Sequence, residues 1–222
     1  MKKVIITGSS GLIGKKISKQ LKKKFKVVNI DLKLGHNLND EKQVKKIFQK
    51  NKDCSYLINL HGLNDHINKG RKQIKNSKDV FLQYSINNVY SLYLTNINFI
   101  NYCKKGRGII NFASLYGINS PKHFLYDQPK DLFYITSKYS VIGLTKYLAT
   151  LYGKKININC IVNGGILNNQ PSNFLKGIVK NIPKGRMMKI SDLYGIIELL
   201  CSDKSQYING SPIILDGGYS SW

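Results

Sequence analysis

Short apolar runs alternate with segments of helical periodicity along the chain. Ile13, Ile17 and Leu21 recur every four residues and predict the buried stripe of a helix. Further helices are predicted around Val44, Ile47 and Phe48 and over residues 77–104, 133–152 and 192–200. Strands are predicted at residues 4–7, 26–32, 56–59, 108–113, 157–162 and 212–215. This alternation predicts one α/β domain over residues 1–222, a three-layer fold in which helices cover both faces of a doubly wound parallel sheet.

The predicted helix at residues 77–104 has one polar residue at a position that needs an explanation. Its stripe consists of Phe81, Tyr84, Asn88, Leu92, Thr95, Phe99 and Cys103. Asn88 occupies a core-facing position, and a buried amide needs hydrogen-bond partners. Two interpretations stay open: a structural bond to a neighbouring loop, or an anchor for a functional water. The polar, lysine-rich residues 64–78 before it predict a surface loop with one helical turn.

Size and composition exclude several classes of protein. A chain of 222 residues can bury roughly 70% of its extended surface, so its core needs neither disulfides nor a structural metal. With 42% hydrophobic and 21% charged residues, it is expected to be globular. No apolar run approaches the roughly 18 residues of a membrane span, and the N-terminus lacks an apolar signal region. We therefore expect a mature, cytoplasmic protein without membrane insertion.

The four cysteines show no metal-ligand spacing. Cys54, Cys103, Cys160 and Cys201 lie about 40 to 60 residues apart, with no C-x-x-C pair. We therefore expect buried thiols in a reducing compartment and no metal site.

The formal net charge of +23 raises the question of a polyanionic partner. Only Arg71, Arg107 and Arg186 are arginines, whereas nucleic-acid sites favour the bidentate guanidinium. We therefore expect no nucleic-acid partner. Three explanations of the charge stay open: compositional bias on a solvated surface, attraction of an anionic substrate or carrier, and a polyanion site.

A glycine-rich loop joins the first predicted strand to the first helix. Gly8, Gly11 and Gly14 let the backbone turn tightly and approach a pyrophosphate, which free N–H groups at the helix N-terminus stabilise. The loop residues expected to contact a dinucleotide are Gly8, Ser10, Gly11, Leu12, Ile13 and Gly14. The alternative is a merely tight turn.

Asp31 ends the second predicted strand, 17 residues after Gly14. A carboxylate there can accept both hydroxyls of an adenosine ribose and repels a 2′-phosphate, which favours NAD over NADP. Lys33 weakens this preference, because a nearby cation could admit NADP. The alternative for Asp31 is a surface acid at the end of a strand.

Tyr134 and Lys138 stand one helical turn apart, so their side chains share a helix face. An ammonium about 4 Å from the phenol contributes on the order of 4 kcal/mol at an effective dielectric of 20. It would lower the phenol's pKa by up to about three, enough for proton transfer near neutral pH. Ser114 ends the fourth predicted strand, where doubly wound sheets bind ligands, and its hydroxyl can donate to a substrate oxygen.

In combination these motifs resemble the short-chain dehydrogenase/reductase family over essentially the whole chain. The features that follow in the family's order are the glycine loop, Asp31, Asn88, Ser114, Tyr134-x-x-x-Lys138, Asn163-Gly164-Gly165-Ile166 and Asp216-Gly217-Gly218. The resemblance implies an NAD(P)-binding Rossmann fold. It also implies an assembly of two or four copies through the helices at residues 77–104 and 133–152.

The resemblance implies a role for each site residue. Tyr134 would be the general acid/base, and Ser114 would orient and polarise the carbonyl or alcohol. Lys138 would bind the nicotinamide ribose and lower the pKa of Tyr134, and Asn88 would hold a water in the proton relay. The further residues expected at the cofactor are Asn37, Leu38, Asn59, Gly62, Gly164 and Ile166, in addition to Tyr134 and Lys138.

The chain departs from the family pattern at four places. Leu12 stands where the family's usual loop has its middle glycine. The resulting spacing of the glycines resembles that of sugar-nucleotide epimerases. The Asn-Asn-Ala-Gly motif reads Asn59-Leu60-His61-Gly62, and His61 is interpreted as a packed neutral histidine rather than a pocket residue. Asn163-Gly164 replaces a Pro-Gly turn. Asn37-Leu38-Asn39-Asp40 stands where an acid usually meets adenine, so an amide would make that contact.

Three segments resemble a subgroup linked to bacterial surface-glycan and flagellin-sugar (nonulosonic acid) biosynthesis: residues 164–171, 183–187 and 216–222. We therefore expect an NAD(P)-dependent oxidoreductase that interconverts an alcohol and a ketone on a sugar or nucleotide sugar. The enzymatic alternative is a 3-oxoacyl-carrier-protein reductase. The non-enzymatic alternative is a nucleotide-sensing or polyanion-binding protein with the same fold.

Overall fold

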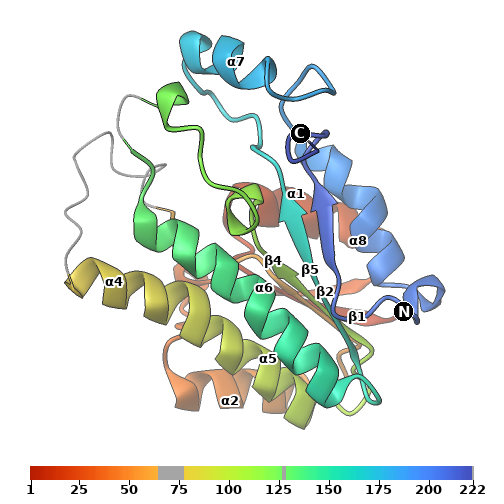
Figure 1. Cartoon of the computed structure of the whole chain (residues 1–222). Helices are drawn as coiled ribbons and strands as arrows, with labels where there is room; N and C mark the ends of the chain where they lie inside the picture. The colour runs from red at the N-terminus through yellow and green to blue at the C-terminus, as the bar shows by residue number, and fades with distance from the viewer. Residues whose placement is uncertain (65–77, 127–128, 222) are drawn as a thin grey trace.

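The computed structural model describes residues 1–64, 78–126 and 129–221. Six parallel strands form one sheet in the order β2-β1-β3-β4-β5-β6 (Figure 1). Their bounds are β1 Lys3–Thr7, β2 Lys26–Ile30, β3 Tyr56–Asn59, β4 Gly108–Phe112, β5 Asn157–Asn163 and β6 Pro212–Leu215. The predicted α/β fold class is confirmed, and all six strands lie where the apolar runs predict them.

Helices cover both faces of the sheet. The α-helices are α1 Leu12–Leu21, α2 Glu41–Lys50, α4 Lys78–Tyr84, α5 Ser91–Tyr102, α6 Leu132–Tyr152, α7 Ser172–Val179 and α8 Tyr194–Leu200. One core cluster joins α2, α5 and α6 to one face, and a second joins α1 and α8 to the other. Alternate strand residues supply the two clusters, since Ile5 belongs to the first and Ile6 to the second.

The predicted long helix is interrupted by a wider turn. A π-helical segment, Ser85–Tyr90, lies between α4 and α5 and contains the buried Asn88. Phe81 was expected in the buried stripe, but 48% of its surface is exposed. The prediction for Phe81 is wrong because the π turn changes the angular phase between α4 and α5.

Two other predictions need adjustment. The second strand ends at Ile30 rather than at residue 32, because the Asp31 carboxylate caps a short 3-10 turn, Leu32–Leu34. Helix α7 was not predicted. The loop predicted at residues 64–78 lies mostly outside the described residues.

A row of buried polar side chains crosses the sheet near the carboxyl ends of its strands. Thr7, Asn59 and Asn111 are register neighbours on β1, β3 and β4. Asn59 Nδ2 donates to Asn111 Oδ1 at 2.9 Å, and Asn111 Nδ2 donates to Thr145 Oγ1 of α6 at 3.0 Å. Because each amide is satisfied internally, this row fixes the strand ends on which the candidate site is built.

All four cysteines are buried free thiols, as the spacing predicts. No helix of the described residues is long and apolar enough to cross a bilayer.

Candidate active site

The glycine loop makes a tight turn above the sheet at the order reversal between β1 and β3. Gly8 has a φ of +64°, and a Cβ on Gly14 would lie 2.2 Å from the Gly8 carbonyl oxygen. The N-terminus of α1 has neither a capping side chain nor an acidic residue in its first turn. Its N–H groups and dipole therefore remain available to an anion, and the backbone can approach it closely.

Asp31 is buried at the end of β2, directly beside this loop. Its Oδ2 accepts a hydrogen bond from Ser10 N at 2.8 Å, and its Oδ1 accepts one from Lys33 N at 2.9 Å. The carboxylate therefore joins the loop to the strand end. The structure brings together the two features that the sequence assigns to a dinucleotide. Leu12, 44% exposed, lies at the mouth of the loop.

The segment after β3 is held by a histidine and an asparagine. His61 Nδ1 lies 2.7 Å from Thr7 Oγ1, and His61 Nε2 lies 3.0 Å from Ser91 Oγ. Both ring nitrogens therefore have a hydroxyl partner, and these two contacts hold the ring in place. Burial, with the charge of Lys138, lowers the pKa of His61 to about 3, which agrees with the packed neutral histidine predicted.

Asn88 uses its whole amide on neighbouring groups. Its Oδ1 accepts from Leu63 N at 2.6 Å, and its Nδ2 donates to Leu63 O at 3.1 Å and to Ser137 Oγ at 3.0 Å. These bonds fit the structural bond to a neighbouring loop, and the anchor for a functional water stays a prediction. Gly62, with a φ of +146°, lies so close that an added Cβ would sit 3.0 Å from Asn88 Oδ1.

Ser114 and Tyr134 meet at the carboxyl end of β4. The Ser114 hydroxyl accepts from Tyr116 N at 3.2 Å and lies close enough to the Tyr134 phenol to oppose the rise of its pKa. Asp131 caps α6, because its Oδ1 accepts from Phe133 N at 2.8 Å and from Tyr134 N at 3.2 Å. The first turn of α6 therefore holds Tyr134 against the strand end.

Lys138 lies beside Tyr134 on α6, the placement that their spacing predicts. Its Nζ lies 5.7 Å from the centroid of the Tyr134 ring and donates to Phe112 O at 3.1 Å. Burial lowers the pKa of Lys138 to about 8. Burial also raises the pKa of Tyr134, and the Ser114 hydrogen bond opposes that rise. The lowering of the Tyr134 pKa by Lys138 stays a prediction, and the Lys138 ammonium here donates to the Phe112 carbonyl.

The remaining predicted cofactor residues fall into two groups. Asn37 and Gly62 are exposed, Ile166 is half-buried, and Gly164 packs so tightly that an added Cβ would lie 2.9 Å from Asp216 Cα. By contrast, the side chains of Leu38 and Asn59 belong to the interior. Only the backbone of these two residues is placed to meet a ligand, a distinction that motif spacing does not reveal.

The geometry fits a nicotinamide dinucleotide. The uncapped helix N-terminus suits a pyrophosphate, Asp31 suits an adenosine ribose, and Lys138 with Tyr134 lies at the far end near the strand tips. No group of three or more metal-ligating side chains occurs among the described residues.

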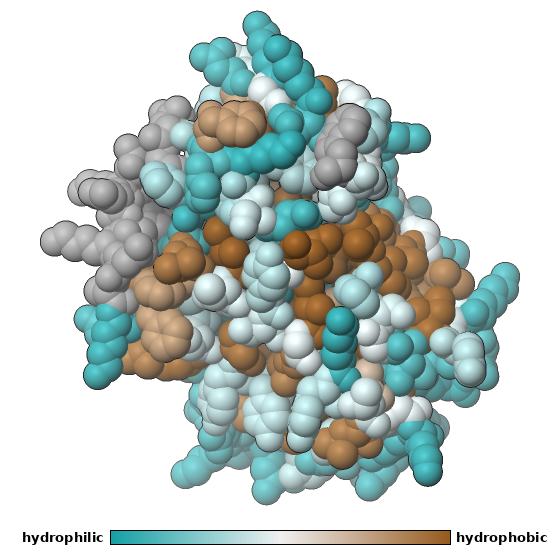
Figure 2. Space-filling view, in the orientation of Figure 1, coloured by the Kyte–Doolittle hydropathy of each residue, from teal (hydrophilic) through white to brown (hydrophobic). Residues whose placement is uncertain are grey.

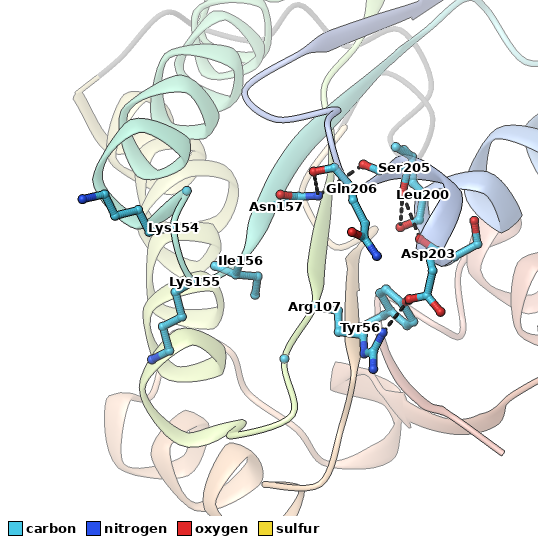
Figure 3. A pocket seen from close by; sticks show the side chains of 13 residues that line it. Tyr56, Arg107, Lys154, Lys155, Ile156, Asn157, Leu200, Asp203, Ser205 and Gln206 are labelled. Carbon is cyan, nitrogen blue, oxygen red and sulfur yellow. Dashed lines mark hydrogen bonds and ion pairs between the residues drawn. The ribbon is translucent and has the colours of Figure 1, made fainter.

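A separate cavity of about 250 Å³ lies at the opposite end of the sheet, by the amino ends of β3, β4 and β5 (Figure 3). In it, Arg107 Nη1 pairs with Asp203 Oδ1 at 2.5 Å. Figure 3 shows Lys154 and Lys155 directed away from that pair. None of the predicted site residues lines this cavity.

Sequence reasoning missed a group of tyrosines beside Tyr134. Tyr84, Tyr116 and Tyr219 share an apolar cluster with it, and Tyr84 packs edge-on at 6.4 Å between ring centroids. The chain has 14 tyrosines, and their spacing along the sequence gives no sign of which ones meet.

Comparison with known proteins agrees with this geometry. The family described as enoyl-(acyl carrier protein) reductase matches residues 3–220. A crystal structure of a short chain dehydrogenase from Leptospira borgpetersenii with bound NAD+ superposes with a TM-score of 0.86 at 28% identity. That superposition covers 99% of this chain and 92% of that one.

Three curated relatives differ in what they act on. Post-translational flagellin modification protein A of Campylobacter coli is 30% identical over 132 residues, which cover 57% of this chain and 52% of that protein. A 3-oxoacyl-[acyl-carrier-protein] reductase of Rickettsia bellii is 28% identical over 96% of this chain and 95% of that protein. A 2-dehydro-3-deoxy-D-gluconate 5-dehydrogenase of Dickeya dadantii is 34% identical over 53% and 47%. The matches thus span about half the length of the first and third relatives.

Proposed function

The chain belongs to the short-chain dehydrogenase/reductase family and is an oxidoreductase acting on CH–OH groups with a nicotinamide cofactor. On that premise we propose that it interconverts an alcohol and a ketone on a sugar or nucleotide sugar. The observation that carries the proposal is that Ser114 and Tyr134 meet at the carboxyl end of β4, with Lys138 Nζ 5.7 Å from the centroid of the Tyr134 ring. The flagellin-modification and gluconate-type relatives support a carbohydrate.

The chemistry assigned to the chain's own residues is proton transfer and positioning. In the oxidative direction the Tyr134 phenolate accepts the proton of the substrate hydroxyl, and Ser114 donates a hydrogen bond to the same oxygen. A bound nicotinamide would accept the hydride that leaves the carbon bearing this hydroxyl, and that carbon becomes the carbonyl. Lys138 keeps a positive charge beside the phenol, and the Phe112 carbonyl holds its Nζ. For Asn88 we propose a positioning role, since its amide fixes the loop at Leu63.

We further propose NAD as the preferred cofactor. The buried Asp31 carboxylate, fixed by Ser10 N and Lys33 N, supports this preference because it would repel a 2′-phosphate. The side chain of Lys33 is exposed and is the nearby cation that could weaken the preference.

The experiment is a turnover assay of the purified chain with NAD(H) and NADP(H) against neutral sugars, sugar acids, nucleotide sugars and acetoacetyl thioesters. We expect a carbohydrate to be oxidised or reduced with NAD(H), and Tyr134→Phe to reduce the rate by about 10²- to 10⁴-fold. Undiminished activity of Tyr134→Phe would contradict the proposed mechanism.

One specific observation favours a second candidate function. The match to the 3-oxoacyl-carrier-protein reductase spans nearly the whole of both chains, and a net charge of +23 suits docking of an acidic carrier protein. In the same assay, preference for NADPH together with turnover of the thioester would favour this reductase over the sugar oxidoreductase.

We also propose that the protein assembles as a homodimer or homotetramer. Tyr139, Gly143, Tyr147 and Leu151 are all exposed and recur every fourth residue along α6, and Tyr93 of α5 is exposed as well. This exposed stripe supports a contact with a second copy. Figure 2 shows a further gathering of apolar side chains in front of β5 and β6, where Ile214 is 50% exposed. A cytoplasmic location stays a prediction.

A further inference from the structure

Three tyrosine hydroxyls gather beside Tyr134 without contributing to the proton chemistry. Tyr116 comes from the turn after β4, Tyr126 from the segment that follows, and Tyr219 from the C-terminal turn. The Tyr116 and Tyr126 hydroxyls hydrogen-bond to each other. Tyr219 is only 4% exposed, yet its hydroxyl has no hydrogen-bond partner in the described part of the chain.

The C-terminal turn fixes Tyr219 in this position. Asp216 Oδ1 accepts from Gly218 N at 2.9 Å, and Asp216 Oδ2 accepts from Ser220 N at 2.9 Å. Gly218 has a φ of +89°, and an added Cβ would lie 2.9 Å from Pro183. A rigidly placed, buried hydroxyl without a partner costs stability, so its position needs an explanation outside the packing of the free protein.

Two lysines face the same tyrosines. Lys122 Nζ lies 5.3 Å from the centroid of the Tyr219 ring and donates to Asn181 Oδ1 at 2.7 Å. Lys130 Nζ lies 5.2 Å from the centroid of the Tyr126 ring. Neither ammonium is in an ion pair with a carboxylate of the described ranges. Among the described residues Lys122 therefore lies beside these tyrosines without a carboxylate partner, whereas Lys130 feels the charge of the neighbouring Asp131.

Helix α7 covers this group. The Tyr126 and Phe174 rings pack at 5.2 Å between centroids, and an added Cβ on Gly177 would lie 3.0 Å from Leu125 Cδ2. Figure 1 shows α7 beside the segment that carries residues 115–126. The Lys122–Asn181 bond joins the two. Both lysines are half-buried, Lys122 against the end of α7 and Lys130 against the Tyr126 ring.

We propose that Tyr116, Tyr126, Tyr219, Lys122 and Lys130, which we call the tyrosine–lysine subsite, bind an anionic group of the substrate, so that acidic sugars are the substrate class. The phenol hydroxyls donate hydrogen bonds and the ammonium groups supply the charge that a carboxylate or phosphate requires. A neutral polyol would leave the charge of Lys122 without a partner, and an apolar acyl chain would leave the Tyr219 hydroxyl unpaired. This proposal rests on the proposed function in one respect: Tyr134 acts on the same molecule that the subsite binds.

The test compares charged and neutral probes of the same shape on the NAD-loaded protein. Calorimetric titrations would use D-gluconate against D-gluconamide, and D-glucose 6-phosphate against D-glucose. We expect at least one anion to bind about 10-fold or more tightly than its neutral partner. The pair that shows the preference identifies the carboxylate or the phosphate as the source of the charge.

Two variants and two matched controls assign the preference to the subsite. Tyr219→Phe and Lys122→Met are each expected to weaken anion binding about 10-fold and to leave the neutral probe unchanged, since a hydrogen bond to a charged group is lost. Tyr219→Phe should melt at the same or a higher temperature, because it removes an unpaired buried hydroxyl. Tyr207→Phe, at a fully exposed ring, and Lys176→Met, on the exposed side of α7, should change neither affinity.

The proposal is overturned if no anion binds more tightly than its neutral partner, or if Tyr219→Phe and Lys122→Met weaken both probes equally. Tyr134→Phe distinguishes a failure of this proposal from a failure of the proposed function. It should abolish turnover and keep the anion preference. Turnover that survives Tyr134→Phe would contradict the proposed mechanism while leaving the binding result intact.

Discussion

The phenol of Tyr134 experiences two opposing influences from its surroundings. Burial raises its pKa, whereas the Ser114 hydrogen bond favours the phenolate and so lowers it. Lys138 stands at the spacing that the sequence predicts, but its Nζ donates to Phe112 O. In the described structure Ser114 is therefore the neighbour that makes Tyr134 a better base.

Ser114→Ala should move the pH dependence of oxidation to higher pH. A hydrogen bond to a charged group contributes about 1.5–3 kcal/mol, and 1.36 kcal/mol corresponds to one pKa unit. Its loss should raise the pKa of Tyr134 in the free enzyme, so the rise of kcat/KM with pH should shift upward by about one to two pH units. Ser140→Ala, on an exposed face of α6, the helix that carries Tyr134, is the control. An unshifted profile in Ser114→Ala would show that Ser114 does not stabilise the phenolate.

His61 should make the fold sensitive to acid. Burial lowers its folded-state pKa from 6.5 to about 3, so the unfolded chain binds a proton at higher pH than the fold does. The stability from neutral His61 is therefore complete above pH 6.5 and is lost as the pH falls from 6.5 toward 3. At pH 5 the loss should be about 2 kcal/mol.

Denaturant unfolding at pH 7.5 and pH 5 would measure this loss. His61→Asn should reduce the difference between the two free energies of unfolding, whereas the exposed His123→Gln should leave it as in the wild type. An equal pH dependence in wild type and His61→Asn would rule out His61 as its origin.

At the scale of elements, the N-terminal caps of two helices allow an effect on stability to be distinguished from an effect on activity. Asp131 caps α6, which carries Tyr134, and Asp40 caps α2, where its Oδ1 accepts from Gln43 N at 3.0 Å. Replacing either cap with Ala should cost about 1 kcal/mol. Only Asp131→Ala should also reduce kcat, by about 10-fold or more, because it loosens the turn that holds Tyr134 against Ser114.

Thermal unfolding and turnover of both variants would check this expectation. Asp131→Asn keeps an oxygen acceptor and should recover most of the activity. If Asp40→Ala and Asp131→Ala lowered kcat equally, the loss would reflect general destabilisation rather than the placement of Tyr134.

Apolar periodicity predicts an element correctly where the backbone keeps a regular helical or extended geometry. It fails where the backbone departs from that geometry. The stripe from Tyr84 to Cys103 is buried as predicted, but the π turn at Ser85–Tyr90 leaves Phe81 exposed. No residue type signals that turn. Helix α7 could have been found, since Phe174 and Ile178 recur at helical spacing, but Gly177 in its centre argues against a helix.

At the scale of the whole molecule, parallel order places motifs that are far apart in sequence at one end of the sheet. Strand ends that the apolar pattern already locates bring Asp31, Ser114 and the glycine loop to this end, so the outline of the site follows from sequence. The Asn59–Asn111 bond and the position of Tyr219 do not follow, because each depends on partners more than 30 residues away. Where a side chain points is settled by three-dimensional packing.

Charge and apolar surface act against each other when two copies associate. Each chain carries a net charge of +23, so copies repel at low salt, whereas the exposed Tyr147 and Leu151 on α6 favour contact. The Debye length falls from about 10 Å at 0.1 M to about 3 Å at 1 M salt. We therefore expect sedimentation velocity to show a dimer or tetramer whose dissociation constant falls as salt rises.

Tyr147→Asp combined with Leu151→Asp should weaken this association by about 10-fold or more, because two apolar side chains are lost from its centre. The change also lowers the positive charge, which by itself would favour association. Tyr207→Asp, at a fully exposed ring outside α6, isolates that charge effect and should associate at least as tightly as wild type. Weaker association of the α6 variant than of this control would place the contact on α6, and equal association of the two would exclude α6 as the interface.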